Sequence, residues 1–344
     1  SGAFRELSVM TAPTSVIKRL LLVILLLSGF LAAALLIALS SGSSRESMGA
    51  SLAIIFGKGD ANTTLETIIW HLRFPRILLA VLVGATLSLG GLVFQALLRN
   101  PLAEPYILGI SGGSAIGAII GIMLGLSRFP GVTFCAFIGS LATLVLILVM
   151  SSGKTILKKD ALLLSGVMVN AFCSAVIMFL VSLTQDARLQ NIIFWLMGDL
   201  SSADTLTTGI LAIILIPCFL VIFFFSHAMN LLLVGKETAQ TMGLPVKTVT
   251  VILLVLTSLM VSATVSYSGL LGFVGLVMPH LLRLIWGPDH RVLVPACILG
   301  GGAYLVVCDL LARTLPQQGE MPAGVITALI GAPVFIFLLK KSRR

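Results

Sequence analysis

The chain has 344 residues, of which 58% are hydrophobic and 10% are charged. A soluble domain usually carries charge on about a quarter of its residues, so this composition excludes a water-soluble globular fold. The formal net charge of +9 does not by itself indicate nucleic-acid binding, because membrane topology accounts for the same excess of lysine and arginine.

Ten apolar runs follow one another along the sequence. Many approach the roughly 20 residues that a helix needs to cross a bilayer. Stretches of strand length in which polar and apolar residues alternate are absent, so helices are the expected spanning elements. The first run is 20–39, and the others are centred near residues 86, 116, 141, 173, 215, 256, 277, 302 and 331. The sequence therefore predicts an all-α polytopic membrane protein with about ten transmembrane helices, forming a single domain over 1–344.

Residues 1–16 precede the first run and are expected to form an N-terminal tail. The chain begins at Ser1 without methionine, which suits a tag remnant and makes Met10 a candidate native start. The run 20–39 is longer than the roughly 7 to 15 apolar residues of a signal peptide, so a first span is favoured. Glycine-rich regions at 105–125 and 266–280 are candidates for broken helices.

Ten spans place both termini on the same side of the membrane. The other side then holds seven of the 22 lysines and arginines, namely Arg45, Lys58, Arg73, Arg76, Arg128, Arg188 and Arg313. The remaining fifteen lie on the side of the termini. Since cytoplasmic loops carry the excess of positive residues, both termini are predicted to be cytoplasmic.

Glycine recurs at every fourth position from Gly113 through Gly117 and Gly121 to Gly125. At helical spacing these residues form a smooth face on which another helix can approach closely in lipid. We expect this face to pack inside one subunit, and contact between subunits is the alternative.

Motifs for chemistry are scarce. The stretch SSGKT at 151–155 resembles the end of a phosphate-binding loop, but Leu148 stands where that loop needs glycine, so a nucleotide site is rejected. The histidines are scattered, and structural roles are favoured over a single haem ligand. The cysteines lie in apolar runs without metal-site spacing. The sequence therefore predicts no metal or cofactor in this chain, and no enzyme.

Polar residues inside the spans favour a conduit. Gly166, Asn170 and Ser174 are four apart and share a helical face. Polar groups in hydrocarbon are costly unless they pair or line a wet cavity. These three residues are therefore candidates for lining a pathway, and hydrogen bonding between helices is the alternative.

A family resemblance is carried by three stretches. They are LRFPRILLAVLVGATLSLGGLVFQALLRNPLAEPYILGISGGSAIGA at 72–118, GLLGFVGLVMPHLLRLIWGPDHR at 269–291 and MPAGVITALIGAPVFIFLLKK at 321–341. They strongly resemble the FecCD-type permeases, which are the membrane subunits of ABC importers for ferric siderophores, haem and cobalamin, and the similarity includes the permease of the cobalamin importer.

The resemblance implies the type II ABC importer permease fold and a homodimer with one translocation path at its interface. It also implies two ABC ATPase subunits, which bind ATP and Mg on the cytoplasmic side. A periplasmic or extracellular substrate-binding protein is expected on the other side, and no nucleic acid is expected as a partner.

The segment 227–247 contains LLLVGKETAQTMGLPVK, which is too polar to cross a bilayer yet patterned like a helix. In the family, the loop after the sixth span folds as two short helices that insert into a cleft of the ATPase. The resemblance therefore implies a cytoplasmic coupling loop here. The candidates for ATPase contact are Gly235, Lys236, Glu237, Ala239, Met242, Gly243 and Leu244. A helix lying on the lipid surface is the alternative.

Three arginines are candidates for docking on the opposite side. Arg73 and Arg76 flank Pro75 at the start of the second span, and Arg313 ends the ninth. Permeases of this family present arginines at these positions to glutamates of the binding protein. Such pairs mainly orient docking and speed encounter. Anchoring to lipid headgroups is the alternative, and Arg313 can also pair with Asp309 one turn earlier.

Asn100 and Leu102 match positions of the cytoplasmic gate in the cobalamin importer. The second gate segment is small and hydroxylated in that importer, whereas Lys158, Lys159 and Asp160 stand at the aligned positions here. This departure indicates different details of gating and is compatible with a different charge on the substrate.

The sequence thus predicts a permease in the cytoplasmic membrane of a bacterium or archaeon. It would import an iron complex, such as a siderophore or haem, or cobalamin, driven by ATP hydrolysis on partner subunits. A stand-alone secondary transporter is the alternative. Such a transporter would need an intramembrane carboxylate or paired half-helices, and no Asp or Glu lies clearly at the middle of a predicted span.

Overall fold

The computed structural model describes residues 13–41, 48–57, 64–151, 159–316 and 319–342, and regular structure in these residues is helical, without strands. The elements are α2 (Pro13–Ser40), α3 (Met48–Ile55), α4 (Thr64–Thr67), η1 (Ile68–Arg73), α5 (Phe74–Leu98), η2 (Pro105–Leu108), α6 (Ile110–Met123), η3 (Arg128–Val132), α7 (Thr133–Ser151), α8 (Lys159–Ser182), α9 (Asp186–Leu196), α10 (Thr205–Phe224), α11 (Ser226–Val234), α12 (Lys236–Thr241), α13 (Val246–Ser268), α14 (Val274–Trp286), α15 (His290–Thr314) and α16 (Ala323–Ser342). The predicted all-α fold is confirmed.

Ten of the helices in the described residues correspond to the predicted spans. Seven are long and apolar enough to cross a membrane, and they are α2, α5, α7, α8, α10, α13 and α15. Three apolar helices, α6, α14 and α16, are shorter. Each predicted centre falls within one of these ten helices.

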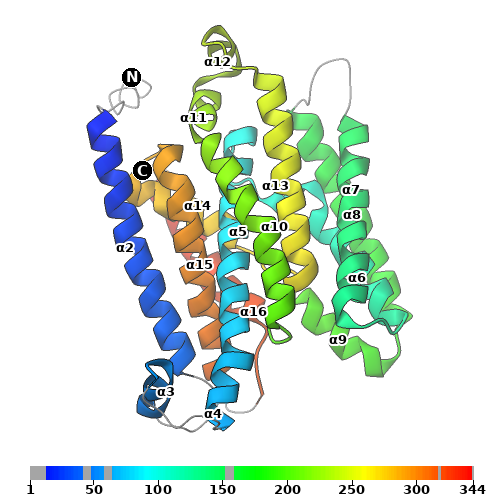
Figure 1. Ribbon diagram of the computed structural model, residues 1–344. Helices are drawn as coiled ribbons and strands as arrows, with labels where there is room; N and C mark the ends of the chain where they lie inside the picture. The colour runs from blue at the N-terminus through cyan, green and yellow to red at the C-terminus, as the bar shows by residue number, and fades with distance from the viewer. Residues whose placement is uncertain (1–12, 42–47, 58–63, 152–158, 317–318, 343–344) are drawn as a thin grey trace.

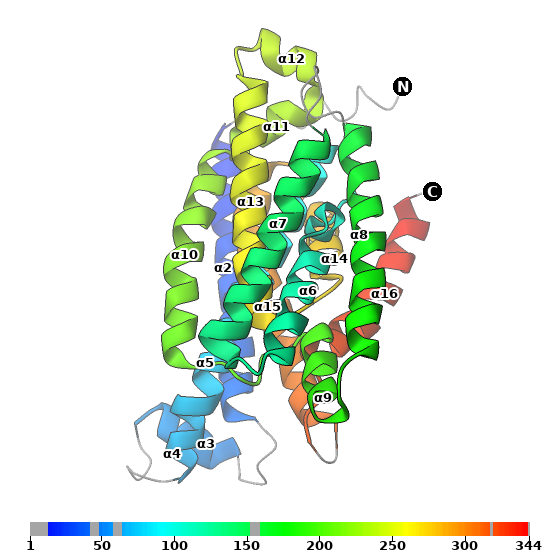
Figure 2. The same cartoon turned by 90° about the vertical axis from the view of Figure 1, so that its right-hand side faces the viewer.

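The spans run between two ends of the molecule (Figures 1 and 2). The short helices α11 and α12 lie at one end, here named the α12 end, and α3, α4 and α9 lie at the other, here named the α9 end. α2 begins and α16 ends in the half of the molecule nearer the α12 end. This arrangement agrees with an even number of spans.

The helix α5 forms the centre of the bundle. In the most apolar stretch of the span that contains α5, 89% of the residues are buried, whereas 17% are buried in the corresponding stretch of α8. Glycines allow this burial, because a Cβ atom on Gly84 would lie 2.2 Å from the carbonyl oxygen of Gly301, and one on Gly91 would lie 1.9 Å from that of Gly275. α5 therefore packs on α15 and α14 through backbone contacts that only glycine permits.

The helix α8 exposes a broad apolar face. Its exposed side chains include Leu164, Val167, Met168, Phe172, Met178 and Phe179. Exposed apolar area of this extent needs lipid or another protein chain to cover it.

Both predicted helix breaks are confirmed, and they contact each other. η2 and Gly109 separate α5 from α6, and residues 269–273 separate α13 from α14. The Tyr106 hydroxyl donates to the carbonyl of Leu271 at 3.1 Å, and the backbone N–H of Leu271 lies 3.3 Å from the same hydroxyl oxygen. Irregular backbone within a membrane must find its hydrogen bonds inside the protein, and these contacts supply part of them.

Three glycines of the predicted face, Gly113, Gly117 and Gly121, lie on α6 and pack inside the chain as expected, whereas Gly125 follows the end of α6 with φ of 71° and is not part of that face. A Cβ atom on Gly113 would lie 2.3 Å from the carbonyl oxygen of Gly139, and one on Gly117 would lie 2.1 Å from that of Cys135. Both partners belong to α7, so the face serves the contact between α6 and α7.

Candidate functional site

The predicted coupling segment folds into two short helices at the α12 end (Figure 1). Gly235 separates α11 from α12 with φ of 152°, and Gly243 ends α12 with φ of 84°. Both angles lie in a region that side chains disfavour, so glycine is required at these turns. The sequence therefore encodes the two bends that raise α12 above the ends of the spans.

The candidate residues of this segment divide by exposure. Lys236, Glu237 and Met242 are exposed. Leu244 is half-buried and donates its N–H to the carbonyl of Ala239 at 3.0 Å. Ala239 itself is completely buried, so it holds α12 on the bundle and is not available for direct contact with a partner.

The three candidate docking arginines converge at the α9 end, where they are buried. Arg73, Arg76 and Arg313 retain only 6%, 7% and 4% of their accessible surface. Arg76 donates to Asp309 at 2.9 Å and to Glu320 at 2.5 Å. Arg313 lies 3.0 Å from the second carboxylate oxygen of Asp309, one helical turn away, which confirms that pairing.

Backbone carbonyls at the end of α2 complete this cluster. Arg73 donates to the carbonyl of Leu39 at 2.9 Å, and Arg313 donates to that of Ala38 at 3.4 Å. The ion pairs therefore join α5, α15 and the segment before α16, and the hydrogen bonds to backbone carbonyls add α2 and η1. The side chain of Glu320 is 39% exposed, so the cluster reaches the surface through this residue.

Two of the predicted gate residues, Asn100 and Leu102, lie just after α5. Asn100 forms a turn in which its side-chain oxygen accepts from the N–H of Leu102 at 3.0 Å. Leu102 is 45% exposed. Lys158 lies outside the described residues. Lys159 begins α8, and its side chain is also outside the description.

The predicted pathway face of α8 packs mainly against η2. A Cβ atom on Gly166 would lie 1.9 Å from the carbonyl oxygen of Ile107, so this residue serves close packing and does not line a path within this chain. Asn170 donates to the carbonyl of Tyr106 at 3.1 Å, which is the alternative role of hydrogen bonding between elements. Ser174 is exposed and donates to the carbonyl of Asn170.

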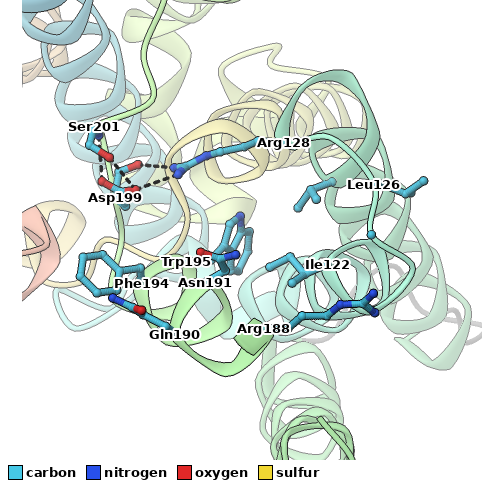
Figure 3. A pocket seen from close by; sticks show the side chains of 12 residues that line it. Ile122, Leu126, Arg128, Arg188, Gln190, Asn191, Phe194, Trp195, Asp199 and Ser201 are labelled. Atoms are coloured by element: carbon cyan, nitrogen blue, oxygen red, sulfur yellow. Dashed lines mark hydrogen bonds and ion pairs between the residues drawn. The ribbon is translucent and has the colours of Figure 1, made fainter. Parts of the chain in front are cut away.

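A cavity of about 610 Å³ opens at the α9 end between α6, η3 and α9 (Figure 3). On one side Arg128 donates to the Asp199 carboxylate at 2.7 Å and to its carbonyl at 2.9 Å. The backbone N–H and hydroxyl of Ser201 also donate to Asp199. Arg188 lies on the opposite side of the cavity, where it contacts the carbonyl of Met123.

The electrostatics of Asp199 follow from these contacts. Burial alone would raise the pKa of its carboxyl, but the Arg128 charge and the hydrogen bonds from Arg128 and Ser201 hold that pKa below its ordinary value. Sequence reasoning missed this pair, which spans 71 residues. A usable signal was that both residues lie outside the apolar runs on the same predicted side of the membrane.

The histidines occupy unrelated positions. His280 packs edge-on against Phe335, with ring centroids 6.3 Å apart, and His290 is fully buried. Within the described ranges, no three His, Cys, Asp or Glu side chains lie close enough together to hold a metal ion.

Comparison with known proteins extends this picture. The model of the FecCD transport family matches residues 30–341. The vitamin B12 import system permease protein BtuC of Citrobacter koseri is 41% identical over 281 residues, covering 81% of this chain and 84% of that protein. The protein of the same name from Salmonella typhimurium is 40% identical and covers 81% and 85%.

Solved structures show the same architecture. A metal-chelate type ABC transporter in an inward-facing conformation superposes with a TM-score of 0.82 at 30% identity, covering 92% of this chain and 98% of that one. PsaBC from Streptococcus pneumoniae, in complex with Fab, superposes with a TM-score of 0.56 at 19% identity, covering 76% and 89%. The second similarity concerns the fold alone.

Proposed function

Because the chain belongs to the FecCD transport family, we propose that it is the permease subunit of an ABC importer that moves cobalamin or another metal chelate into the cytoplasm. ATP hydrolysis on two partner ATPase subunits drives the transport. The observation that carries this proposal is the match of the family model to residues 30–341, nearly the whole bundle.

Cobalamin is the first substrate to test. The relatives that share about 40% of their residues with this chain are named vitamin B12 import permeases. Iron chelates, namely a ferric siderophore or haem, are the other candidates, since the family imports such complexes as well. The metal chelate is cargo in this proposal.

The coupling segment supports the role of the ATPase partners. α12 stands at one end of the bundle with Lys236, Glu237 and Met242 exposed. A short helix that begins with charged side chains and is followed by an exposed apolar one fits a groove of a partner protein. We place the ATPase at this end, which makes it the cytoplasmic end.

The arginine cluster supports docking of a binding protein at the α9 end. Arg76 is already bound to Glu320, whose side chain is partly exposed. A glutamate of the binding protein can therefore replace Glu320 as the partner of Arg76 without leaving the guanidinium unpaired. Docking by such a replacement reconciles the predicted role with the burial of the arginines.

Two copies of the chain complete the path in this proposal. The exposed apolar face of α8 needs a cover, and a second copy provides one beside Ser174. A stand-alone secondary transporter is less well supported. The buried carboxylate of Asp309 is neutralised by two arginines, so it is not free to bind a coupling ion.

Reconstitution into proteoliposomes tests the proposal. The chain is combined with its cognate ATPase and binding protein, and uptake of cobalamin, haem and a ferric siderophore is measured separately with and without ATP. Accumulation of one substrate that requires ATP supports the proposal. Accumulation by the permease alone, driven by an ion gradient, would replace it with the secondary transporter.

A further inference from the structure

A polar side chain of α11 is hydrogen-bonded to the turn between α14 and α15. Asn230, in the middle of α11, donates from Nδ2 to the carboxylate of Asp289 at 2.7 Å. Its Oδ1 accepts from the backbone N–H of His290 at 2.9 Å and lies 2.8 Å from Nδ1 of the same residue. Because a backbone N–H can only donate, this contact fixes which way the amide points.

The receiving carboxylate, that of Asp289, accepts several other hydrogen bonds. Asp289 is the N-cap of α15, and its carboxylate accepts from the N–H of Arg291 at 3.0 Å and from the Arg291 guanidinium at 2.7 Å. Burial would raise the pKa of Asp289, but the hydrogen bonds from Arg291 and Asn230 hold it below its ordinary value. His290 is completely buried. Asn230 therefore donates to an ionised carboxylate that Arg291 also holds.

The turn that carries Asp289 leads to α14 and from there to the predicted gate. α14 and α5 touch through backbone at Gly275 and Gly91. Gln95 of α5 also donates to the carbonyl of Gly275 at 3.3 Å. The segment before α14 is hydrogen-bonded to Tyr106, which belongs to the same interruption as Asn100. Displacement of the turn would thus be passed toward residues 99–109.

The peptide chain itself links the coupling segment to α10 and α13, and not to the turn between α14 and α15. α11 follows α10 in the chain, and α12 precedes α13. The amide of Asn230 gives α11 a polar connection to the turn between α14 and α15 as well. Coupling between distant parts of a protein travels through such packed and hydrogen-bonded groups, provided that they move as a unit.

We propose that Asn230 is a positioning residue that transmits movement of α11 and α12 to the turn between α14 and α15, and so couples ATP hydrolysis to opening of the path. This inference rests on the proposed function. It assigns to Asn230 no contact with substrate or nucleotide.

The test compares Asn230→Leu with the wild-type complex in proteoliposomes that contain the cognate ATPase and binding protein. Leucine has a similar volume but forms no hydrogen bond. We expect the ATPase to remain bound and active, whereas substrate taken up per ATP hydrolysed falls by roughly ten-fold or more. Loss of the hydrogen bond to the charged Asp289 alone represents about that factor in an equilibrium, and the hydrogen bond from the His290 N–H is lost as well.

Two further variants separate coupling from folding. Asn230→Asp places a second carboxylate against Asp289 and should uncouple equally, whereas the double change Asn230→Asp with Asp289→Asn restores a donor opposite an acceptor and should recover coupling. Ser28→Leu changes an exposed residue of α2, outside the coupling segment, and should have no effect. A wild-type ratio of uptake to hydrolysis in Asn230→Leu, or failure of the double change to recover coupling, would overturn the proposal.

A distance measurement decides the matter without transport. Spin labels at Gln240 of α12 and at Pro288, both exposed, report whether α12 and the turn move together when ATP binds to the complex. The distance should stay constant in the wild type and change in Asn230→Leu. A distance that changes equally in both would contradict the link, while absence of uptake by the wild type would count against the proposed function alone.

Discussion

Nε of Arg76 donates to Oδ1 of Asp309 at 2.9 Å, which joins two spans at positions 233 residues apart. The other oxygen of the same carboxylate faces Arg313 at 3.0 Å. One buried carboxylate thus holds two buried guanidinium groups. Removing one partner of a buried ion pair is far more costly than the pair is worth, because the remaining charge is left without compensation.

Replacing Asp309 with Ala should therefore destabilise the bundle by about 3–5 kcal/mol. Thermal unfolding in detergent, followed by loss of the monodisperse species, measures the effect as a lower Tm. Glu320→Gln is the control, because the side chain of Glu320 is 39% exposed and an exposed ion pair contributes about 1 kcal/mol or less. Equal Tm values for the two variants would show that burial does not determine how much each carboxylate of this cluster contributes to stability.

Glu320→Gln should also strengthen docking of the binding protein. If a carboxylate of the binding protein replaces Glu320 at Arg76, weakening the internal pair lowers the free-energy cost of that replacement. An exposed ion pair contributes about 1 kcal/mol, so the Kd for the binding protein should fall by roughly five-fold. Arg76→Glu should act in the opposite direction. Binding measured at low and high salt should show the gain shrinking as ions screen the charges. Unchanged affinity in Glu320→Gln would argue against docking by replacement.

Met242→Asp should weaken association with the ATPase. Met242 is 58% exposed on the projecting segment, and loss of an apolar anchor in a partner groove costs about 2 kcal/mol or more when the residue is a hot spot. Co-purification and ATPase activity of the complex measure the loss. Met242→Leu keeps an apolar side chain and serves as the control. Normal assembly of Met242→Asp would remove this residue from the interface.

Gly91→Ala should disrupt the contact between α5 and α14. The added methyl group would lie 1.9 Å from the carbonyl oxygen of Gly275, and overpacking of a core typically costs about 1–3 kcal/mol. Gly209→Ala is the matched control, because a Cβ atom at that position meets nothing within 4 Å. The Tm should fall in the first variant and hold or rise in the second. A stable Gly91→Ala protein would mean that the two helices can separate without cost.

The pair of Arg128 and Asp199 should make stability depend on acid pH. The pKa of Asp199 is lowered in the folded protein, so its contribution is complete above the unfolded value of about 4 and is lost as pH falls below that value through the folded pKa. Since the Arg128 side chain is 38% exposed, solvent screening limits the contribution to about 1 kcal/mol. Asp199→Asn should have a lower Tm at pH 7 and a smaller decrease between pH 4 and pH 2. If the Tm of the variant decreases with acid pH as much as that of the wild type, the decrease arises from other carboxylates.

Much of the fold follows from local sequence. The length of each apolar run predicts a span because a helix must satisfy its own backbone in lipid, and this requirement acts within a single segment. For the same reason the breaks near Gly109 and Gly269 could be predicted, since glycine clusters interrupt helices locally. The two bends around α12 are encoded likewise at Gly235 and Gly243. The family resemblance then supplied the coupling, docking and gate candidates, whereas the pathway candidates came from helical spacing.

Burial and partners could not be predicted in this way. Arg76 and Asp309, or Asn230 and Asp289, meet only when distant helices pack, and periodicity within one segment contains no information about such a contact. From the sequence, Ala239 was a candidate for contact with the ATPase and Gly166 for lining the pathway. In the structure Ala239 is fully buried, and Gly166 packs closely against a backbone carbonyl of η2. The sequence alone thus determined the class of protein and the order of its spans, because hydrophobic length and charge act locally. Only the tertiary structure decided which polar groups face each other, because the cost of burying a charge is set by whatever packs around it.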